Sequence, residues 1–394
     1  MAESSLKLTD DEVLAEDMGK YFADALGFVM YSYEWDTDPS LQLVELEEPY
    51  KSRFGCKYGP DKWACEFLDG ISEKVRKNDF TGRNPVDAIR EAVASGHGIG
   101  KSAMAAWLVD WIMSTRPYAQ GTVTANTNSQ LETKTWAQIA KWTKKCITGH
   151  WFNVSTGRGS MKMAHKEHPE SWFCTAQTCR EENSESFAGQ HAPNSTSFYV
   201  NDEGSAIPDK IYEVEEGGLT DGEPMQFVFG NPTRNSGKFH RIFHGTEGKR
   251  WGKRQIDSRN VKITNKQQLK EWVDDYGIDS DFVKVRVRGM FPSMSVKQFI
   301  SVDDVDKAFG KSLRPESYHF APKILTCDPA WEGDDELVIG LRQGLAFSIL
   351  RTIAKNDNDI HVATILANLE DEHNADAVFI DGGYGTGILS AGKI

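Results

Sequence analysis

The sequence predicts an α/β protein with two domains, the first built on a mainly parallel sheet flanked by helices. Three observations lead to this prediction. Strand-like and helix-like hydrophobic periods alternate along most of the chain, which is typical of parallel sheets covered by helices. A second run of alternating elements begins near Pro315, after proline and polar residues interrupt the pattern over 293–316. The length of 394 residues suits two to three domains of about 150 residues each.

The elements of the first domain follow from local patterns. A helix is expected where apolar residues recur on one face, as Trp63, Phe67 and Ile71 do. Short β-branched or aromatic runs bounded by polar residues are expected to be strands. We therefore expect helices over 60–75, 103–113 and 130–146, and strands over 89–94, 121–125, 197–200 and 226–229.

The second domain is predicted from the order of its elements. We expect a strand over 323–327, a hairpin over 336–341 and 345–350, a helix over 360–373 and a strand over 377–380. This order opens a ribonuclease-H-like fold. The chain ends 13 residues past Asp381, so we expect only the first part of such a domain.

The net charge of −13 is concentrated at the N-terminus. Residues 1–50 contain 13 acidic and 2 basic residues, so the other residues together carry a formal charge of only −2. The total argues against a polyanionic partner, but its distribution does not. We therefore expect an acidic leader attached to a nearly neutral body.

The composition excludes several classes of protein. Hydrophobic residues at 39% and charged residues at 26% exclude a wholly disordered chain. The polar N-terminus excludes a secretory signal, and no early apolar run approaches the roughly 20 residues of a membrane span. Six scattered cysteines without a Cys-x-x-Cys pair indicate reduced thiols in a cytoplasm. His165, His168, Cys174 and Cys179 match no common zinc spacing, so we interpret them as ordinary side chains.

A glycine-rich loop is the strongest signal in the sequence. It follows an expected strand, precedes an apolar helix, and reads Ser95, Gly96, His97, Gly98, Ile99, Gly100, Lys101 and Ser102. In a P-loop the glycines let backbone N–H groups surround phosphate oxygens, and the helix N-terminus adds a favourable dipole. Lys101 is expected to reach the β- and γ-phosphates, and Ser102 to bind Mg²⁺. Ser95 stands where the motif has its first glycine.

An acidic pair and an asparagine end two later strands. Asp202 is expected to hold the Mg²⁺ shell, and Glu203 to act as general base on the attacking water. Asn231 can sense the γ-phosphate, although Gly-Asn-Pro is also an ordinary turn. The guanine signature Asn-Lys-x-Asp is missing, because residues 265–268 read Asn-Lys-Gln-Gln, which favours ATP over GTP.

Two stretches are rich in basic residues and poor in acids. Residues 133–166 contain seven Lys or Arg and no Asp or Glu, with three tryptophans interleaved, and residues 234–262 contain nine bases against two acids. A solvated helix face usually mixes both signs, so this asymmetry predicts contacts with DNA phosphates. A subunit interface is the alternative interpretation.

Two aspartates end strands of the expected second domain. Asp328 follows the strand over 323–327, and Asp381 follows the strand over 377–380. In a ribonuclease-H-like sheet these strand ends are adjacent, so both carboxylates can share divalent cations, Mg²⁺ or Mn²⁺, for phosphodiester hydrolysis. Asp334 and Asp335 could assist them or belong to a solvated turn. A third carboxylate usually comes from a later element.

With these motifs in this order, the chain resembles the large terminase subunit of tailed double-stranded DNA bacteriophages. The resemblance covers about residues 50–394. Besides the loop and the acidic pair, it rests on Val123–Thr127, Lys134–Trp136, Gly230–Thr233, Gly289–Pro292, Asp328–Ala330, Gly333–Asp335 and Asp381–Gly383. It implies an ATP-driven motor that moves double-stranded DNA into a procapsid and an endonuclease that cuts concatemeric DNA. It also implies a homo-oligomer on the portal protein, with a small terminase subunit as partner, in the cytoplasm of the infected bacterial host.

This interpretation divides the chain into an acidic N-terminal leader (1–50), a P-loop ATPase domain (51–315) and a partial ribonuclease-H-like nuclease domain (316–394). The resemblance implies that Asn231–Thr233 couples hydrolysis to movement. The family often has a glutamine beside an aromatic residue for adenine, but Ala64 follows Trp63 here. No arginine lies within 95–102, so an arginine finger must come from elsewhere.

Two other functions fit parts of the pattern. One is a helicase or repair-type P-loop ATPase fused to a nuclease-like fold, which would separate DNA strands. The other is a DNA-binding scaffold with a degenerate nucleotide site, which would not depend on Lys101.

Overall fold

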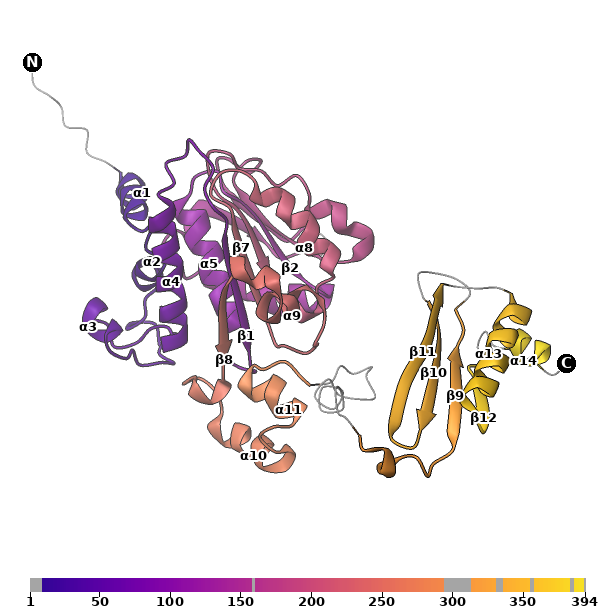
Figure 1. The fold of residues 1–394 in the computed structure, drawn as a ribbon. Helices are drawn as coiled ribbons and strands as arrows, with labels where there is room; N and C mark the ends of the chain where they lie inside the picture. The colour runs from indigo at the N-terminus through magenta and orange to yellow at the C-terminus, as the bar shows by residue number, and fades with distance from the viewer. Residues whose placement is uncertain are drawn as a thin grey trace, which may run out of the picture. The chain divides into compact units, whose positions relative to one another are not determined.

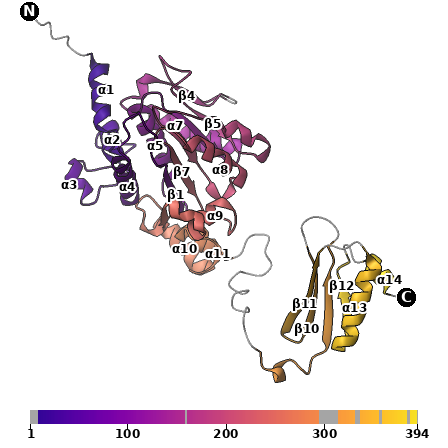
Figure 2. The ribbon, with the colours of Figure 1, turned by 45° about the horizontal axis from the view of Figure 1, so that its top comes forward.

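The chain forms two compact units, residues 1–303 and 304–394. The computed structural model describes residues 9–157, 160–293, 313–330, 336–354, 358–382 and 386–392. Figures 1 and 2 show the ribbon from two directions. The larger unit contains the glycine-rich loop, and the smaller unit contains Asp328 and Asp381.

The larger unit is built on one eight-stranded sheet with the strand order β3-β4-β5-β2-β6-β7-β1-β8. Every neighbouring pair from β5 to β8 is parallel, and only the pairs of β4 with β3 and with β5 are antiparallel. The prediction of a mainly parallel α/β sheet is therefore confirmed. The strands are β1 (Ile89–Ser95), β2 (Gln120–Ala125), β3 (Phe152–Ser155), β4 (Lys162–His165), β5 (Phe173–Thr178), β6 (Ser197–Asn201), β7 (Met225–Gly230) and β8 (Gly252–Ile256).

Helices cover both faces of this sheet (Figure 1). The α-helices are α1 (Asp10–Lys20), α2 (Ala25–Ser32), α3 (Tyr50–Phe54), α4 (Lys62–Asn78), α5 (Lys101–Thr115), α6 (Asn128–Gln130), α7 (Ala137–Thr143), α8 (Asp209–Glu215), α9 (Gly237–His244), α10 (Lys266–Tyr276) and α11 (Asp281–Val283). Two π-helices span Leu131–Trp136 and Lys284–Arg288. Short 3₁₀ helices lie at Gly149–Trp151, Glu181–Phe187, Gly204–Ala206, Glu216–Leu219, Thr246–Arg250, Ser258–Asn260 and, in the smaller unit, Pro315–Ser317.

Strand alternation explains the two-sided packing. Val93 of β1 belongs to the core under α4 and α5, whereas Ala92 and Ala94 belong to the core under α8 and α9. This is the period of two that a strand requires when both faces are buried. Helix α5, which follows the glycine-rich loop, is buried all round from residue 104 to 115, because it lies at the centre of the first core.

Most of the expected leader is part of this core. Met18, Leu26, Phe28 and Trp35 are at most 4% exposed and pack with α4 and α5. From residue 18 onward, the segment that we expected to be an acidic leader packs against the larger unit. Its acidic composition conceals these apolar residues, because the acids lie on the outward-facing positions. Among the described residues, no helix is long and apolar enough to cross a membrane.

The smaller unit has a four-stranded sheet with the order β11-β10-β9-β12. Its elements are β9 (Lys323–Asp328), β10 (Glu336–Gln343), β11 (Ala346–Ala354), α13 (Asp359–His373), β12 (Ala377–Ile380) and α14 (Thr386–Ala391). The hairpin is antiparallel, and β12 pairs in parallel with β9. These elements follow the predicted order. Their assignment to a ribonuclease-H-like nuclease stays a prediction.

Candidate functional site

The carboxyl ends of three parallel strands form the candidate nucleotide site. Strands β6, β7 and β1 are consecutive in the sheet, so the residues that follow them gather at one edge. The glycine-rich loop follows β1, the acidic pair follows β6, and Asn231 follows β7. Ligands of open α/β sheets bind outside such carboxyl ends.

The glycine-rich loop has the backbone that a phosphate cradle needs. Gly98 and Gly100 have φ angles of 78° and 90°, a region that glycine enters without steric cost. The N–H groups of residues 98–100 donate no hydrogen bond within the described part of the chain. Ile99 is 2% exposed, and its carbonyl accepts a hydrogen bond of 3.1 Å from Trp63 Nε1, which anchors the loop. Ser95, in the place of the first glycine, is the last residue of β1, so its side chain costs the loop nothing.

Lys101 lies inside the loop and holds it together. Its Nζ donates to Ser95 Oγ at 3.1 Å, to the Gly96 carbonyl at 3.4 Å and to Asn231 Oδ1 at 3.3 Å. Burial lowers the pKa of Lys101 to about 8, while the carboxylates of Asp202 and Glu203 act in the opposite direction. A bound anion such as a phosphate would therefore favour the charged form of Lys101.

The acidic pair is held in a defined geometry. Asp202 is 8% exposed, and its carboxylate accepts hydrogen bonds from Thr135 Oγ1 at 2.5 Å and from the Glu203 N–H at 2.9 Å. Glu203 has φ 57° and ψ 46°, a left-handed backbone that costs a non-glycine residue free energy and is concentrated at functional sites. Burial raises the pKa of Glu203, and Asp202 adds to the rise, which makes the carboxylate a better base.

Asn231 connects the loop to the neighbouring strands. Its Nδ2 donates to the Ser95 carbonyl at 2.6 Å, while its Oδ1 accepts from Lys101. Its own carbonyl accepts from Ser205 Oγ at 2.9 Å, two residues past Glu203. The structure thus brings all the predicted nucleotide-site residues of the three strand ends to one edge.

Two sets of residues at this edge escaped the sequence analysis. Thr135, which bonds Asp202, lies on the π-helix Leu131–Trp136; the motif containing it was recognised, but not its contact. The other set comes from residues 257–293, where the sequence offered the Gly289–Pro292 motif but no sign of a contact with the loop. Ser258 Oγ donates to the His97 carbonyl at 2.7 Å, and the His97 N–H donates to the Arg286 carbonyl at 2.8 Å.

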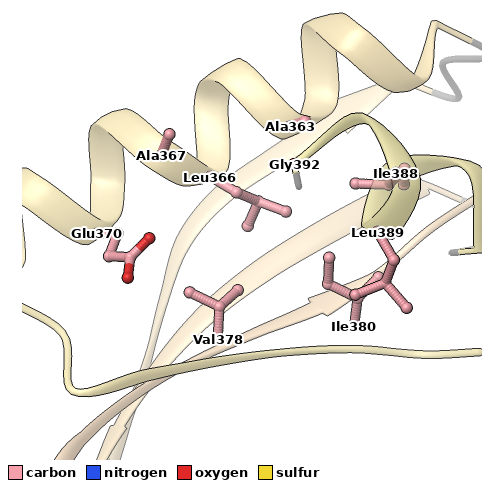
Figure 3. A pocket seen from close by; sticks show the side chains of 9 residues that line it. All are labelled: Ala363, Leu366, Ala367, Glu370, Val378, Ile380, Ile388, Leu389 and Gly392. Atoms are coloured by element: carbon pink, nitrogen blue, oxygen red, sulfur yellow. The ribbon is translucent and has the colours of Figure 1, made fainter. Parts of the chain in front are cut away.

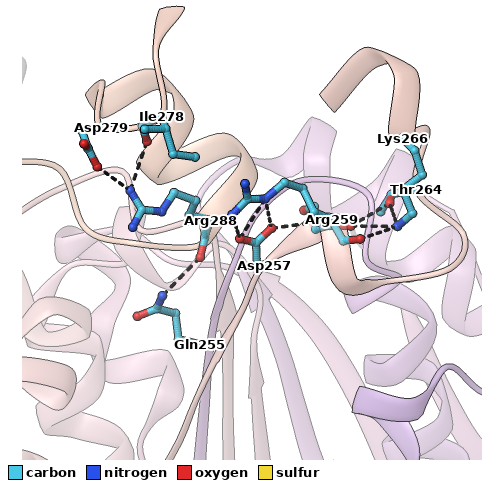
Figure 4. A network of polar contacts seen from close by, with 9 residues as sticks. Gln255, Asp257, Arg259, Thr264, Lys266, Ile278, Asp279 and Arg288 are labelled. Carbon is cyan, nitrogen blue, oxygen red and sulfur yellow. Dashed lines mark hydrogen bonds and ion pairs between the residues drawn. The ribbon is translucent and has the colours of Figure 1, made fainter. Parts of the chain in front are cut away.

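Polar contacts hold residues 257–293 in one shape (Figure 4). Lys266 Nζ donates to the carbonyls of Ser258 and Arg259, at 3.4 and 2.9 Å. Arg288 donates to the Ile278 carbonyl at 3.1 Å and to Asp279 Oδ1 at 2.9 Å. The segment therefore presents a preformed surface to the loop.

A cavity of about 200 Å³ opens between this segment and the acidic pair. It is lined by His97, Glu203, Ser205, Ala206, Asn231, Thr233, Val285 and Arg286. Polar and charged groups from all three sequence motifs face it. A smaller pocket of about 90 Å³ lies beside Ile99 and Gly100 and is lined largely by apolar residues, among them four tryptophans: Trp35, Trp63, Trp107 and Trp142.

The two predicted nuclease aspartates end adjacent strands of the smaller unit. Asp328 is the exposed last residue of β9, and the Asp381 N–H donates to the Cys327 carbonyl at 3.0 Å. Both therefore lie at one edge of the sheet. Asp334 and Asp335 lie outside the described residues. Among the residues that are described, no group of three or more His, Cys, Asp or Glu is placed to hold a metal ion.

An apolar hollow of about 190 Å³ lies elsewhere in the smaller unit, between α13, α14 and β12 (Figure 3). Leu366, Val378, Ile380 and Ile388 line it, and Glu370 is the one charged residue of its lining. Such a lining does not suit a phosphodiester.

Some basic residues of the two basic stretches already form ion pairs within the protein. Leader acids pair with them: Asp38 with Lys145, Glu47 with Lys262 at 2.9 Å, and Asp11 with His150 at 2.7 Å. Two of the three interleaved tryptophans are not available to a DNA surface. Trp136 and Trp142 are 0% and 8% exposed and belong to the core.

Comparisons with known proteins agree with the motifs. No family model matches the chain. The chain is 24% identical over 270 residues to a probable terminase large subunit of Enterobacteria phage P7, across 64% of this chain and 52% of that protein. It thus spans about half the length of this curated relative.

Among solved structures, the large terminase of a thermophilic bacteriophage aligns over 76% of this chain and 74% of its own, with 13% identity and a TM-score of 0.42. The large terminase ATPase domain of Thermus phage P74-26 aligns over 51% of this chain and 88% of its own, with 17% identity and a TM-score of 0.38. In sequence, the chain resembles the large terminase subunits of bacteriophages, as its motifs predict.

Proposed function

We propose that the larger unit binds and hydrolyses ATP with Mg²⁺, and that the protein is a DNA-packaging motor of the terminase type. The observation that carries this proposal is the bonded set of Ser95, Lys101 and Asn231 at the sheet edge where the acidic pair also lies. Similarity to a phage terminase supports DNA packaging over other P-loop functions.

The residues of the site divide the work of hydrolysis. The unpaired loop N–H groups and the first turn of α5 bind phosphate oxygens, and Lys101 adds a cation. Ser102 and Asp202 supply the oxygen ligands that Mg²⁺ prefers, and the ion offsets phosphate charge. Glu203 accepts a proton from water as the water oxygen bonds to the γ-phosphorus. The bond from that phosphorus to the β–γ bridging oxygen breaks, which releases ADP and phosphate.

The apolar pocket beside Ile99 suits a purine base, since aromatic walls stack on flat rings. If adenine enters it, Ile263→Asp at its edge should weaken ATP binding and leave tripolyphosphate binding unchanged. Equal weakening of both would place the base elsewhere.

Substitutions at the nucleotide site test the ATPase proposal. Lys101→Ala should abolish ATP binding, whereas Glu203→Gln should keep binding and slow hydrolysis roughly 10²- to 10⁴-fold, the usual contribution of a general base. Lys210→Ala, an exposed lysine of α8, is the control and should change neither. Unchanged turnover in Lys101→Ala would favour the DNA-binding scaffold, and strand separation by the wild type would favour a helicase.

The DNA-binding part of the proposal rests on one basic face. Lys141, Lys144 and Lys145 line a surface groove of about 450 Å³, and among the described residues neither Lys141 nor Lys144 forms an ion pair. Replacing both by alanine should reduce the salt dependence of duplex binding by a log–log slope of about 2. Lys210→Ala, on α8, is the control. An unchanged slope would remove this face from the DNA path.

The nuclease part of the proposal rests on Asp328 and Asp381. Two such carboxylates can bind divalent ions that stabilise the attacking and leaving oxygens of a phosphodiester. Mn²⁺ binding and Mn²⁺-dependent plasmid cutting should both be lost in Asp328→Asn and kept in Asp371→Asn, on α13. Metal binding that survives in Asp328→Asn would refute the site.

We further propose that the protein forms a homo-oligomer on the portal protein, has a small terminase subunit as partner and acts in the cytoplasm of the host. These proposals rest only on the similarity of this chain to terminases.

A further inference from the structure

Residues 257–293 pack on the glycine-rich loop backbone against backbone. The Gly96 N–H donates to the Ile256 carbonyl at 3.1 Å, directly before this segment, and the His97 N–H donates to the Arg286 carbonyl. A Cβ atom on Gly289 would lie 2.6 Å from the Ser95 Cα, so no side chain fits between the two backbones. The segment cannot move away from the loop without breaking these contacts.

Arg286 is the cation that this segment brings to the nucleotide cavity. It is exposed and lines the cavity opposite Glu203, Asn231 and Thr233. Its guanidinium lies 4.8 Å from the centre of the Phe282 ring, which supports the side chain without neutralising it. Within the described residues, no carboxylate forms an ion pair with Arg286.

The surroundings of His97 indicate where the positive charge is concentrated. The pKa of His97 is lowered to about 4, chiefly by burial and additionally by the positive charges of Lys101, Arg286 and Lys134. Arg286 lines the cavity together with His97, and Lys101 follows the loop at the start of α5, so cations from two separate elements lie beside the loop. This arrangement suits a ligand with several negative charges next to the one that Lys101 binds.

We propose that Arg286 contacts the γ-phosphate of ATP bound to the loop of the same chain, so that residues 257–293 distinguish ATP from ADP. This inference rests on the proposed ATPase function. A guanidinium offers several donors in a plane and bonds two phosphate oxygens at once. Only the triphosphate extends into the cavity beyond Lys101, so this contact forms with ATP and is lost with ADP.

The consequence is a connection from the nucleotide to the segment. The backbone of Arg286 is already hydrogen-bonded to the loop. A contact between its side chain and the γ-phosphate would therefore connect the segment to the loop a second time, through the nucleotide. When the γ-phosphate leaves after hydrolysis, the side-chain contact is lost and the backbone bond remains. No arginine within 95–102 was available from the sequence to meet the γ-phosphate, and this geometry supplies one in cis.

Nucleotide affinity tests the proposal without depending on turnover. The dilute, monomeric protein is titrated with ADP and with a non-hydrolysable ATP analogue in Mg²⁺. Arg286→Ala should weaken binding of the analogue by roughly 10- to 100-fold, the range of hydrogen bonds to charged groups, and change ADP affinity less than about twofold. Arg286→Lys keeps the positive charge but not the planar guanidinium group. Its affinity for the analogue should lie between those of the wild type and Arg286→Ala. Hydrogen exchange of residues 257–293 should slow with the analogue in the wild type and not in Arg286→Ala.

Lys270→Ala is the control, because Lys270 is an exposed cation on α10 of the same segment and pairs with Asp274 at 2.6 Å. It should leave both affinities unchanged. Equal effects of Arg286→Ala on ADP and analogue, or no effect on either, would overturn the proposal. Discrimination that appears only in an assembled oligomer would place the contact between subunits and overturn it as well. A wild type that binds neither nucleotide would instead refute the proposed function.

Discussion

Glu215→Gln should stabilise the protein, with a gain that depends on pH. Glu215 ends α8 with no exposed surface, and one carboxylate oxygen accepts from Asn201 Nδ2 at 2.8 Å and from Gln226 Nε2 at 2.6 Å. Among the described residues, the other oxygen has no hydrogen-bond partner, and neither do Asn201 Oδ1 and Gln226 Oε1. Three buried acceptors thus lack a donor. A glutamine at 215 replaces the unpaired oxygen with an N–H₂ group that can donate to the other two acceptors, and it keeps one oxygen for the existing bonds.

The magnitude follows from the pKa of Glu215. Burial raises this pKa from 4.5 to about 7, with bonds from Asn201 and Gln226 opposing the rise. The folded protein thus favours the neutral form. The cost of ionisation is absent below pH 4.5, grows as the pH rises, and is complete above about pH 7. At about 1.36 kcal/mol per unit of pKa, the full cost is about 3 kcal/mol.

Denaturant unfolding of the wild type and Glu215→Gln at pH 5, 7 and 8 measures this effect. We expect the variant to be more stable by about 1 to 3 kcal/mol at pH 8 and the difference to shrink toward pH 5. Glu213→Gln is the control on the same helix. Its carboxylate is 66% exposed and 3.4 Å from Lys210, so its effect should stay within about 0.5 kcal/mol. A variant that is less stable at pH 8, or a difference that does not change with pH, would refute this account of the buried cluster.

Three further substitutions test the packing around the site. Gly96→Ala would press a Cβ atom against carbonyl oxygens of the 284–288 π-helix. It should lower the free energy of unfolding by about 1 to 3 kcal/mol and reduce ATP turnover. Gly19→Ala, which has open space around it, is the control and should do neither. Glu223→Gln should cost about 3 to 5 kcal/mol in denaturant unfolding, because it leaves the guanidinium of Arg116, 1% exposed, without its partner at 2.7 Å. Trp63→Phe removes the indole hydrogen bond to the loop and should cost about 1 kcal/mol; a neutral result would show that the bond does not stabilise the loop.

The nucleotide site was predictable where its determinants are local. The strand, the glycines and the helix of 89–115 are consecutive, so their pattern can be read without knowledge of the fold. Thr135 and Arg286 were not predictable as site residues, because they reach the acidic pair and the cavity from elements far away in sequence. Their positions follow from how the helices and the sheet pack, which a local pattern does not contain.

The remaining differences also have physical reasons. Strand β8 lies at the sheet edge and is only half buried, so its Gly-Lys-Arg-Gln-Ile sequence lacks the apolar run that marks an inner strand. Asn201 is a buried polar residue at the end of the otherwise largely apolar strand β6, and Glu215 explains it, because the two side chains pair inside the protein. Charge counting marked residues 1–50 as an acidic leader but did not predict their buried apolar residues, since counting ignores which side chains face inward.

The ion pairs between leader acids and basic stretches bear on how the protein would meet a polyanion. Asp38 and Glu47 act as built-in counterions for Lys145 and Lys262. When a phosphate binds such a lysine, the DNA loses a condensed cation, but the displaced carboxylate attracts a cation in turn, so the net release of ions is smaller. The number of phosphates inferred from the salt dependence of DNA binding should therefore be smaller than the number of lysines that touch the DNA. Deleting residues 1–50 would uncover these lysines but would also expose the core that Leu26 and Phe28 fill.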